Sequence, residues 1–493
     1  MFLKVNYKFP ASIYQQILLI IFIFLSHDIE ASNIDNNLLQ QNSDYLNQKM
    51  VIESALKHYP KILAYYEKIN LANSNLLSQM GVFDIRIRQE YSDKTRGYYD
   101  GKYYDLLLEK QNELFNNKIY GGYRRSNGDF PSYEANKYTS QEGKFIAGGK
   151  VSLLQNNTID KNRLAIKLSN LDISLSKLQI DNIKNILIRD AKKAYLEWFF
   201  AREKYFQYQN LYQLAITRNN ALEIRYKKGD IAKITLIEGQ RNLLQRQNEL
   251  SFAKIDFENS AIYLSLFLRD DNGKSIIVDE SRLANHHHYF DVKNIAFKNH
   301  QLNQDLDSAY NNNPELHILD LQVKKEQENL RYYNNLLMPK LDLQFELSRN
   351  ISQNSNNYAR IKDQDENMVK LNFEMPFRQR EARGNIDGSL AKIKSLQYER
   401  QLLKDKITNE IKQIFTNLTN FYNIANNIES ELRLTKSLVK AEQERFNQGA
   451  SSLFLLNQRE QELLKIQIDQ IHLIKNFYKT VADYEMLTFN QMN

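Results

Sequence analysis

The chain has 493 residues, 25% of them charged, with a net charge of +7 and a mean hydropathy of −0.59. The high charged fraction and the negative mean hydropathy exclude a helical membrane protein. The mixing of basic with acidic residues argues against a basic stripe that would bind nucleic acid. The absence of cysteine excludes disulfides, thiolate metal sites and a lipidated N-terminal cysteine. Only 15 glycines and 6 prolines interrupt the chain, which predicts long helices.

The first residues are typical of a signal peptide. Lys4 and Lys8 give a basic start, an apolar run follows from Ile17 to Leu25, and Ala31 is the expected cleavage point. The apolar run is shorter than the roughly 20 residues that a membrane-spanning helix needs. We therefore expect residues 1–31 to direct export, the alternative being an uncleaved membrane anchor.

Motifs that recur in the same order predict an internal duplication. Alanine precedes proline by five residues in Ala55–Pro60 and again in Ala309–Pro314. A strand-like zone follows in both copies, and Arg225-Tyr-Lys-Lys-Gly229 then matches Arg445-Phe-Asn-Gln-Gly449. Each match alone is weak, but their shared order indicates one ancestral unit that was duplicated.

The two copies differ in length within the strand-like zone. Proline and glycine are 169 residues apart in the first copy and 135 in the second, so the first copy has 34 additional residues. Nearly all of them lie between Gly81 and Leu154, where we expect an additional hairpin or a long loop. The expected parts are a first repeat at 50–268 (strand zone 82–154, helical hairpin 160–268), a connector at 269–308, and a second repeat at 309–493 (strand zone 341–377, helical hairpin 385–490).

Apolar and polar residues alternate in the strand-like zones. In the second copy the apolar positions are Leu341, Leu343, Phe345, Leu347, Val369, Leu371, Phe373 and Met375. In the first copy they are Phe83, Ile85, Ile87, Phe145, Ala147, Val151 and Leu153. Period two with one apolar face predicts half-buried strands. A transmembrane barrel and a soluble β-subdomain both fit this alternation, while the tyrosines clustered between Tyr98 and Tyr123 suit a bilayer interface.

The rest of the chain has helical periodicity. Apolar residues from Leu403 to Leu432 recur at spacings of three and four, which is typical of a near-heptad seam. Neither proline nor glycine occurs from about residue 160 to Lys228, and roughly 65 helical residues would make a rod of about 100 Å. Such rods bury only a stripe, so they must pack against other helices; a solvent-exposed coiled-coil stalk is the alternative.

The turns at Gly229 and Gly449 resemble the hairpin tips of the TolC-like outer membrane factor family, also called outer membrane efflux proteins. The copies read RYKKGDIAKITLIEGQRNLL and RFNQGASSLFLLNQREQELL, and the family pattern is Arg-aromatic-x-x-Gly, often with serine three residues later. Ser452 fits the serine position, whereas Ala232 departs from it. MVKLNFEMPFRQREARGNI resembles the last strand of a family repeat, its proline and the entry into the long helix. The resemblance covers about residues 50–490.

The resemblance implies a mainly α fold with a β-barrel part. Duplicated units of helix, hairpin and long helix would form a trimeric transmembrane β-barrel that continues as a periplasmic α-helical barrel. Two strands per repeat would give four per chain and twelve per trimer, with the additional residues of the first copy forming either added strands or an extracellular loop. The implied function is passive conduction of efflux or type I secretion substrates.

The implied location is the outer membrane, with a long periplasmic extension. The implied partners are two further copies of the chain, outer-membrane lipid, a periplasmic adaptor protein and an inner-membrane pump; no nucleic acid and no cofactor is implied. The implied gate or adaptor contacts at the hairpin tips are Arg225, Tyr226, Gly229, Asp230, Arg445, Phe446, Gly449 and Ser452.

The residues of the tips also fit plain helix capping. Glycine commonly ends a helix because it adopts the left-handed conformation without a Cβ clash. Asp230 is expected to act as an N-cap or near-cap rather than as a selectivity residue. No acid follows the second tip until Glu460, so a carboxylate gate is not expected there.

No enzymatic role is expected, since the sequence has neither a GxxxxGK[ST] phosphate loop nor a catalytic triad signature. His286-His287-His288 lies in the polar connector and is expected to be a solvated linker rather than a metal site. Two other protein classes use helical hairpins. A coiled-coil scaffold would not need amphipathic strands, and an adaptor should have one hairpin flanked by glycine-rich segments.

Overall fold

The computed structural model describes residues 45–113, 116–282, 289, 302–352 and 365–489. The expected signal peptide, residues 1–31, and His286-His287-His288 lie outside these ranges. From Leu46 onward the described residues belong to one structural unit.

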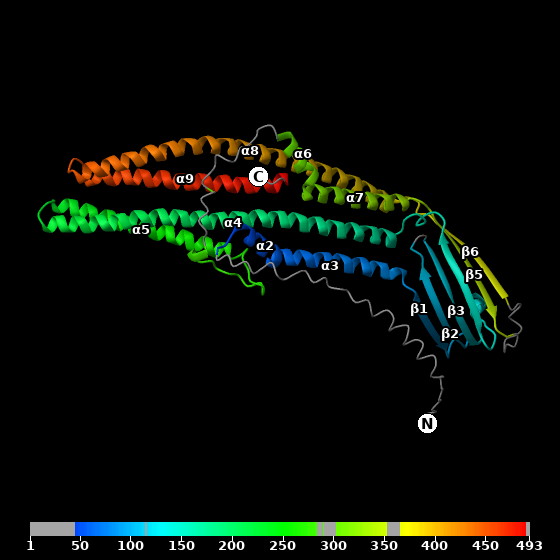
Figure 1. Ribbon diagram of the computed structural model, residues 1–493. Coiled ribbons are helices and arrows are strands. Elements are labelled where there is room, and N and C mark those ends of the chain that lie inside the picture. The colour runs from blue at the N-terminus through cyan, green and yellow to red at the C-terminus, as the bar shows by residue number, and fades with distance from the viewer. Residues whose placement is uncertain (1–44, 114–115, 283–288, 290–301, 353–364, 490–493) are drawn as a thin grey trace, which may run out of the picture. The chain divides into compact units, whose positions relative to one another are not determined.

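The same order of elements occurs twice along this unit (Figure 1). A short helix is followed by a helix that begins at proline, then by strands, a long helix and a shorter helix. The helices of the first half are α2 (Gln48–His58), α3 (Pro60–Met80), α4 (Lys161–Lys227) and α5 (Lys233–Leu264). Those of the second half are α6 (Leu302–Asn312), α7 (Pro314–Asn335), α8 (Arg380–Asn447) and α9 (Leu453–Thr488). Short 3-10 turns lie at η2 (Gly81–Phe83), η3 (Ser132–Lys137) and η4 (Glu280–Arg282).

The two alanine–proline motifs form equivalent helix junctions. Proline suits the first position of a helix because that position has no intrahelical partner for an N–H. The Tyr59 N–H donates to the Ala55 carbonyl at 3.0 Å, and the Asn313 N–H donates to the Ala309 carbonyl at 3.1 Å. Both alanines are fully buried. Each motif therefore ends one helix and starts the next against the core.

One antiparallel sheet of six strands, in the order β1-β2-β3-β4-β5-β6, joins the two halves of the chain. Its strands are β1 (Arg86–Lys94), β2 (Gly101–Gln111), β3 (Asn117–Gly128), β4 (Lys144–Ser152), β5 (Lys340–Asn350) and β6 (Asp365–Glu374). β4 pairs with β5 across the two halves, with Lys144 opposite Asn350.

The first repeat contributes four strands instead of the two of the family pattern, which confirms the additional hairpin and excludes the long loop as its alternative. β1 follows α3 and η2, and β4 leads into α4, so the additional residues form the hairpin of β2 and β3. Phe83, expected in a strand, lies instead in η2 and is buried. The first strand therefore begins only at Arg86, after η2, where pairing with β2 starts.

The long helices α4 and α8 have 67 and 68 residues and are therefore each about 100 Å long. α4 packs against α5, α9, α3, α7 and α2, while α8 packs against α9 and α7. Because α4 follows β4 and α8 follows β6, the turns after α4 and α8 lie at the far ends of these helices from the sheet (Figure 1).

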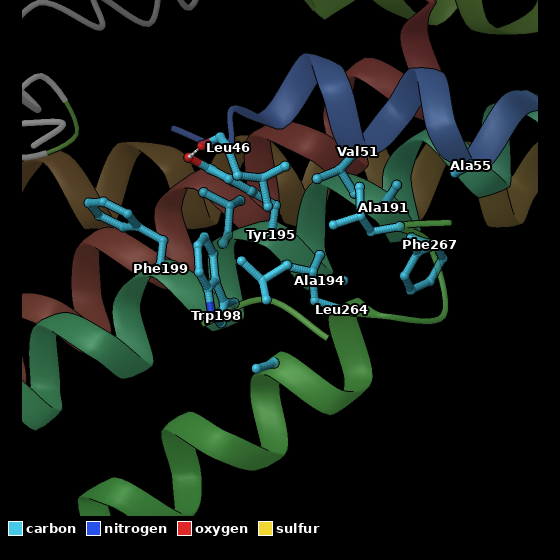
Figure 2. Close-up of a cluster of buried hydrophobic side chains, with 14 of the residues drawn as sticks. Leu46, Val51, Ala55, Ala191, Ala194, Tyr195, Trp198, Phe199, Leu264 and Phe267 are labelled. Atoms are coloured by element: carbon cyan, nitrogen blue, oxygen red, sulfur yellow. Dashed lines mark hydrogen bonds between the residues drawn. The ribbon is translucent and has the colours of Figure 1, made fainter. Parts of the chain in front are cut away.

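The main core lies where α2, α4, α5 and α9 meet (Figure 2). Trp198 of α4 is fully buried and stacks on Phe257 of α5, with ring centroids 6.4 Å apart. Ala191 and Ala194 are also fully buried on α4. Their small side chains allow neighbouring helices to approach closely, so the long helix is held at its middle by packing rather than by its own propensity.

A second core joins α8 to α9 and to the α6–α7 junction. It uses residues of the predicted heptad seam, including Ile407, Ile411 and Leu418, against Phe477 and Tyr484 of α9. The seam of α8 is therefore buried by its own hairpin partner in this region.

Ion pairs add to the contact between α4 and α9. Glu197 accepts hydrogen bonds from Lys475 at 2.9 Å and from Lys479, and Lys193 pairs with Asp483 at 2.5 Å. Burial alone would raise the pKa of Glu197, but the two lysines outweigh it and hold this pKa below its usual value of 4.5.

The lowered pKa of Glu197 predicts an acid-sensitive contribution to stability. A carboxylate whose folded pKa is depressed stabilises the protein above its unfolded pKa, and this contribution is lost as the pH falls through the folded pKa. Glu197→Gln should therefore lower the thermal midpoint at about pH 7 and have a smaller effect at about pH 3. Circular dichroism in detergent measures both. Asp256→Asn is the control. Asp256 pairs with Lys204 but is more exposed than Glu197, so its loss should change the thermal midpoint little at either pH.

Candidate functional site

The register of the sheet separates an apolar face from a polar face. Residues paired across antiparallel strands lie on the same face, so Ile87 shares a face with Leu108, and Leu106 with Tyr123. Continued across all six strands, the apolar side chains of this face include Ile87, Leu106, Leu108, Ile119, Phe145, Ala147, Leu343, Phe345, Leu347, Val369, Leu371 and Phe373.

Much of this apolar face is exposed in the single chain. Ile87 is 73% exposed, Val369 75% and Phe373 66%. Tyr91 and Tyr104 are paired on the same face toward the end of the sheet farthest from the helices. An exposed apolar surface this extensive marks an interaction with another apolar phase, and tyrosines at its border are typical of a membrane interface.

The polar face carries ion pairs that cross between strands. Glu109 of β2 pairs with Arg88 of β1 at 3.3 Å and with Lys118 of β3 at 2.7 Å. Arg124 of β3 donates two hydrogen bonds, of 2.5 and 2.6 Å, to Asp105 of β2. Further pairs are Lys150–Asp342, Lys340–Glu374, Lys144–Glu366 and the Tyr120–Glu346 hydrogen bond. This face is suited to water.

The sheet has two open edges within the described part of the chain. β1 pairs only with β2, and β6 only with β5. Each edge strand is nine or ten residues long and presents unpaired backbone groups. Such edges can pair with a strand of another chain.

The two hairpin tips have the same backbone geometry. The Gly229 N–H donates to Tyr226 and the Asp230 N–H to Arg225, both at 2.9 Å. Gly449 and Ala450 make the equivalent bonds to Phe446 and Arg445, at 3.1 and 2.9 Å. With φ values of 79° and 75°, the glycines adopt the left-handed conformation of a Schellman cap. The Arg-aromatic-x-x-Gly pattern is thus a motif that ends a helix, independently of any role in gating or adaptor contact.

The polar residues at the tips have separate positions. Ser452 caps α9 by accepting a hydrogen bond from the Leu455 N–H at 3.3 Å. Of the two alternatives for Asp230, N-cap and near-cap, the first is wrong, because the N-cap of α5 is Ala232, which provides no side-chain cap. Arg225, Tyr226 and Asp230 are all exposed.

The conformation of Gly229 predicts a local effect of substitution. Gly229→Ala should destabilise the first tip by about 1 kcal/mol, since a Cβ is unfavourable in the left-handed region even where surrounding space is open. Gly384→Ala is the matched control, because Gly384 also has open space around it but lies within α8. Hydrogen exchange at each site is the measurement. Faster exchange should appear at the first tip alone, and equal changes at both sites would contradict the assignment.

Sequence reasoning missed the contact that joins the two hairpins near their tips. Arg218 of α4 binds Glu460 of α9 through two hydrogen bonds of 2.7 and 2.5 Å. It also donates to Asn457 and to Gln443 of α8. Glu460 is the first acid after the second tip, and it is buried in this pair.

Within the described residues, no group of three or more histidine, cysteine, aspartate or glutamate side chains is arranged to hold a metal ion. No helix in the described part of the chain combines the length and apolarity needed to cross a bilayer.

Comparison with known proteins gives a family match and a shared fold. Residues 306–482 match the family described as outer membrane efflux protein. No curated protein gives a significant sequence match. Over 90% of this chain, the fold is similar to that of the CmeC outer membrane channel of Campylobacter jejuni, with a TM-score of 0.62, 13% identity and 86% of that chain covered.

Two other solved structures share the fold to a similar extent. The outer membrane protein VceC of Vibrio cholerae matches 90% of this chain and 97% of its own length, with a TM-score of 0.63 and 10% identity. The open state of the MtrE outer membrane channel of Neisseria gonorrhoeae matches 90% of this chain and 88% of its own length, with a TM-score of 0.61 and 11% identity. Residues 306–482 thus match the outer membrane efflux protein family, and the described chain has the fold of outer membrane channels, which confirms the expected resemblance to the TolC-like family.

Proposed function

We propose that the chain is the outer-membrane channel subunit of an efflux or type I secretion system, and that three copies build one duct. The observation that carries this proposal is the sheet. Its apolar face suits lipid, its ion-paired face suits water, and its two edges lack partners within the described chain.

Closure of the sheet sets the strand number of the barrel. β6 of one copy would pair with β1 of the next, which removes every open edge. Three chains of six strands give eighteen strands instead of the twelve expected from the family pattern. Barrels of about 16 to 18 strands enclose an aqueous channel.

The helices would form the wall of the duct in the periplasm. α5 exposes a stripe of apolar side chains, among them Ile237, Leu244, Phe252, Ile255 and Ile262. α8 likewise exposes Tyr398, Leu402, Leu434 and Leu438. The spacing of these residues suits helix-to-helix packing, so we assign both stripes to contacts between neighbouring copies.

The hairpin tips would lie deepest in the periplasm, about 100 Å from the sheet. The proposed contacts of an adaptor protein, and the proposed gate, are Arg225, Tyr226, Gly229, Asp230, Arg445, Phe446, Gly449 and Ser452. Exposure of the polar tip residues supports this role. Conduction would be passive, with energy supplied by an inner-membrane pump.

The competing classes account less well for the sheet. A coiled-coil scaffold in the periplasm has no use for an apolar face that is exposed on six strands. An adaptor would have a single helical hairpin, whereas this chain has two, α4–α5 and α8–α9.

The test is to purify the chain in detergent, measure its mass, and record conductance in planar lipid bilayers. The expected result is a trimer that forms discrete channels, with protein dissociated by heat as the inactive control. A monomer that is soluble without detergent and forms no channels would overturn the proposal.

A further inference from the structure

The segment between β3 and β4, residues 129–143, folds back over the polar face of the sheet. The side chains of the sheet that hydrogen-bond to this segment, described below, lie on the polar face. The row formed by Arg124, Lys144 and Asn350 crosses three neighbouring strands in register. The segment lies over this row, at the end of the sheet farthest from the helices.

Each residue of this row holds the segment. Arg124 donates to the Asn136 carbonyl at 3.1 Å, and Lys144 donates to the same carbonyl at 2.8 Å. Asn350 accepts a hydrogen bond from the Ser140 N–H at 2.8 Å. The Lys144 side chain is only 2% exposed, since it is enclosed between this carbonyl and Glu366, 3.1 Å away. An enclosed, paired lysine fixes the segment more firmly than surface contacts would.

The segment also has a small core of its own. The Phe130 and Tyr138 rings meet edge to face with centroids 5.3 Å apart, and the Tyr138 hydroxyl donates to the Phe130 carbonyl at 2.6 Å. Gly101 of β2 allows this approach, because a Cβ there would lie 3.0 Å from the Phe130 ring. Tyr133, by contrast, is 75% exposed.

We propose that residues 129–143 narrow the outer mouth of the channel and limit the size of the solutes that pass. This inference rests on the proposed function, in which the polar face lines the lumen and the free end of the sheet opens outward. Three copies would place three such segments around one mouth. The added hairpin widens the barrel, and the segment that follows this hairpin narrows it again.

The absence of cysteine allows a direct test with single-cysteine variants. Tyr133→Cys places a thiol on the exposed part of the segment, and Tyr98→Cys places one on the neighbouring turn between β1 and β2, where Tyr98 is 86% exposed. A bulky, charged, water-soluble thiol reagent is added to the outer side of a single channel in a planar bilayer. Labelling of Tyr133→Cys should remove about half or more of the conductance, in up to three steps, whereas labelled Tyr98→Cys should conduct as before.

A variant without Ser132–Lys137 should show the opposite effect, a higher conductance and entry of larger polymers into the pore. Labelled Tyr133→Cys channels with unchanged conductance, or equal losses in both cysteine variants, would overturn the inference even if the deletion variant does not fold. A wild-type chain that forms no channels would instead refute the proposed function, so the two failures are distinguishable.

Discussion

Glu460→Ala should destabilise the contact between the two helical hairpins by about 3–5 kcal/mol, because it leaves the Arg218 guanidinium buried without its charge partner. The side chains of Arg218 and Glu460 are only 11% and 6% exposed, so water can replace the lost carboxylate only poorly. The remaining acceptors, Asn457 and Gln443, are neutral. The measurement is hydrogen exchange of α4 and α9 on either side of the pair, where we expect faster exchange.

A double-mutant cycle separates the ion pair from simple loss of packing. Removing Arg218 together with Glu460 should cost less than the sum of the two single changes, because no unpaired charge remains. Glu462→Gln is the control, since Glu462 makes a more exposed pair with Arg459 that should contribute at most about 0.5 kcal/mol. Strictly additive losses in the cycle would show that the pair does not couple the hairpins.

This contact also shows what periodicity leaves undetermined. Long stretches without glycine or proline, and heptad spacing of apolar residues, predict long helices. Both features can be read from residues that are close together in the sequence. Arg218 and Glu460 are 242 positions apart in the sequence. Nothing local to either residue indicates that the two hairpins meet there, so the sequence shows that Glu460 is the first acid after the second tip but not that Arg218 is its partner.

Strict alternation identifies individual strands in this sequence, and masked alternation does not. β5 and β6 alternate cleanly, as in Leu341, Leu343 and Phe345, and the structure confirms both strands. β2 contains three consecutive leucines, Leu106 to Leu108, which hide its parity. β3 has two adjacent glycines, at 121 and 122, which contribute no side chain to either face. Because apolar and polar residues do not alternate clearly there, the sequence alone does not decide whether the additional residues form strands or a loop.

Arginine at Val369 is expected to disrupt insertion of the sheet. Val369 is 75% exposed in the single chain and lies in mid-strand on the apolar face, opposite Phe345. A charged side chain at the middle of a bilayer costs a transmembrane barrel about 2–4 kcal/mol per chain, and the proposed trimer would incur this cost three times. The fraction of heat-dissociable trimer recovered in the membrane should therefore fall severely.

The matched control is arginine at Asn372, three positions further along the same strand but on the polar face, opposite Asp342. Its side chain would project toward water and an acidic neighbour, so the trimer yield should stay close to that of the wild type. The two substitutions add the same charge to the same edge strand, and they differ in the face that receives it. If Val369→Arg assembled as well as Asn372→Arg, the apolar face would not contact lipid, and the barrel would have to be closed in some other way.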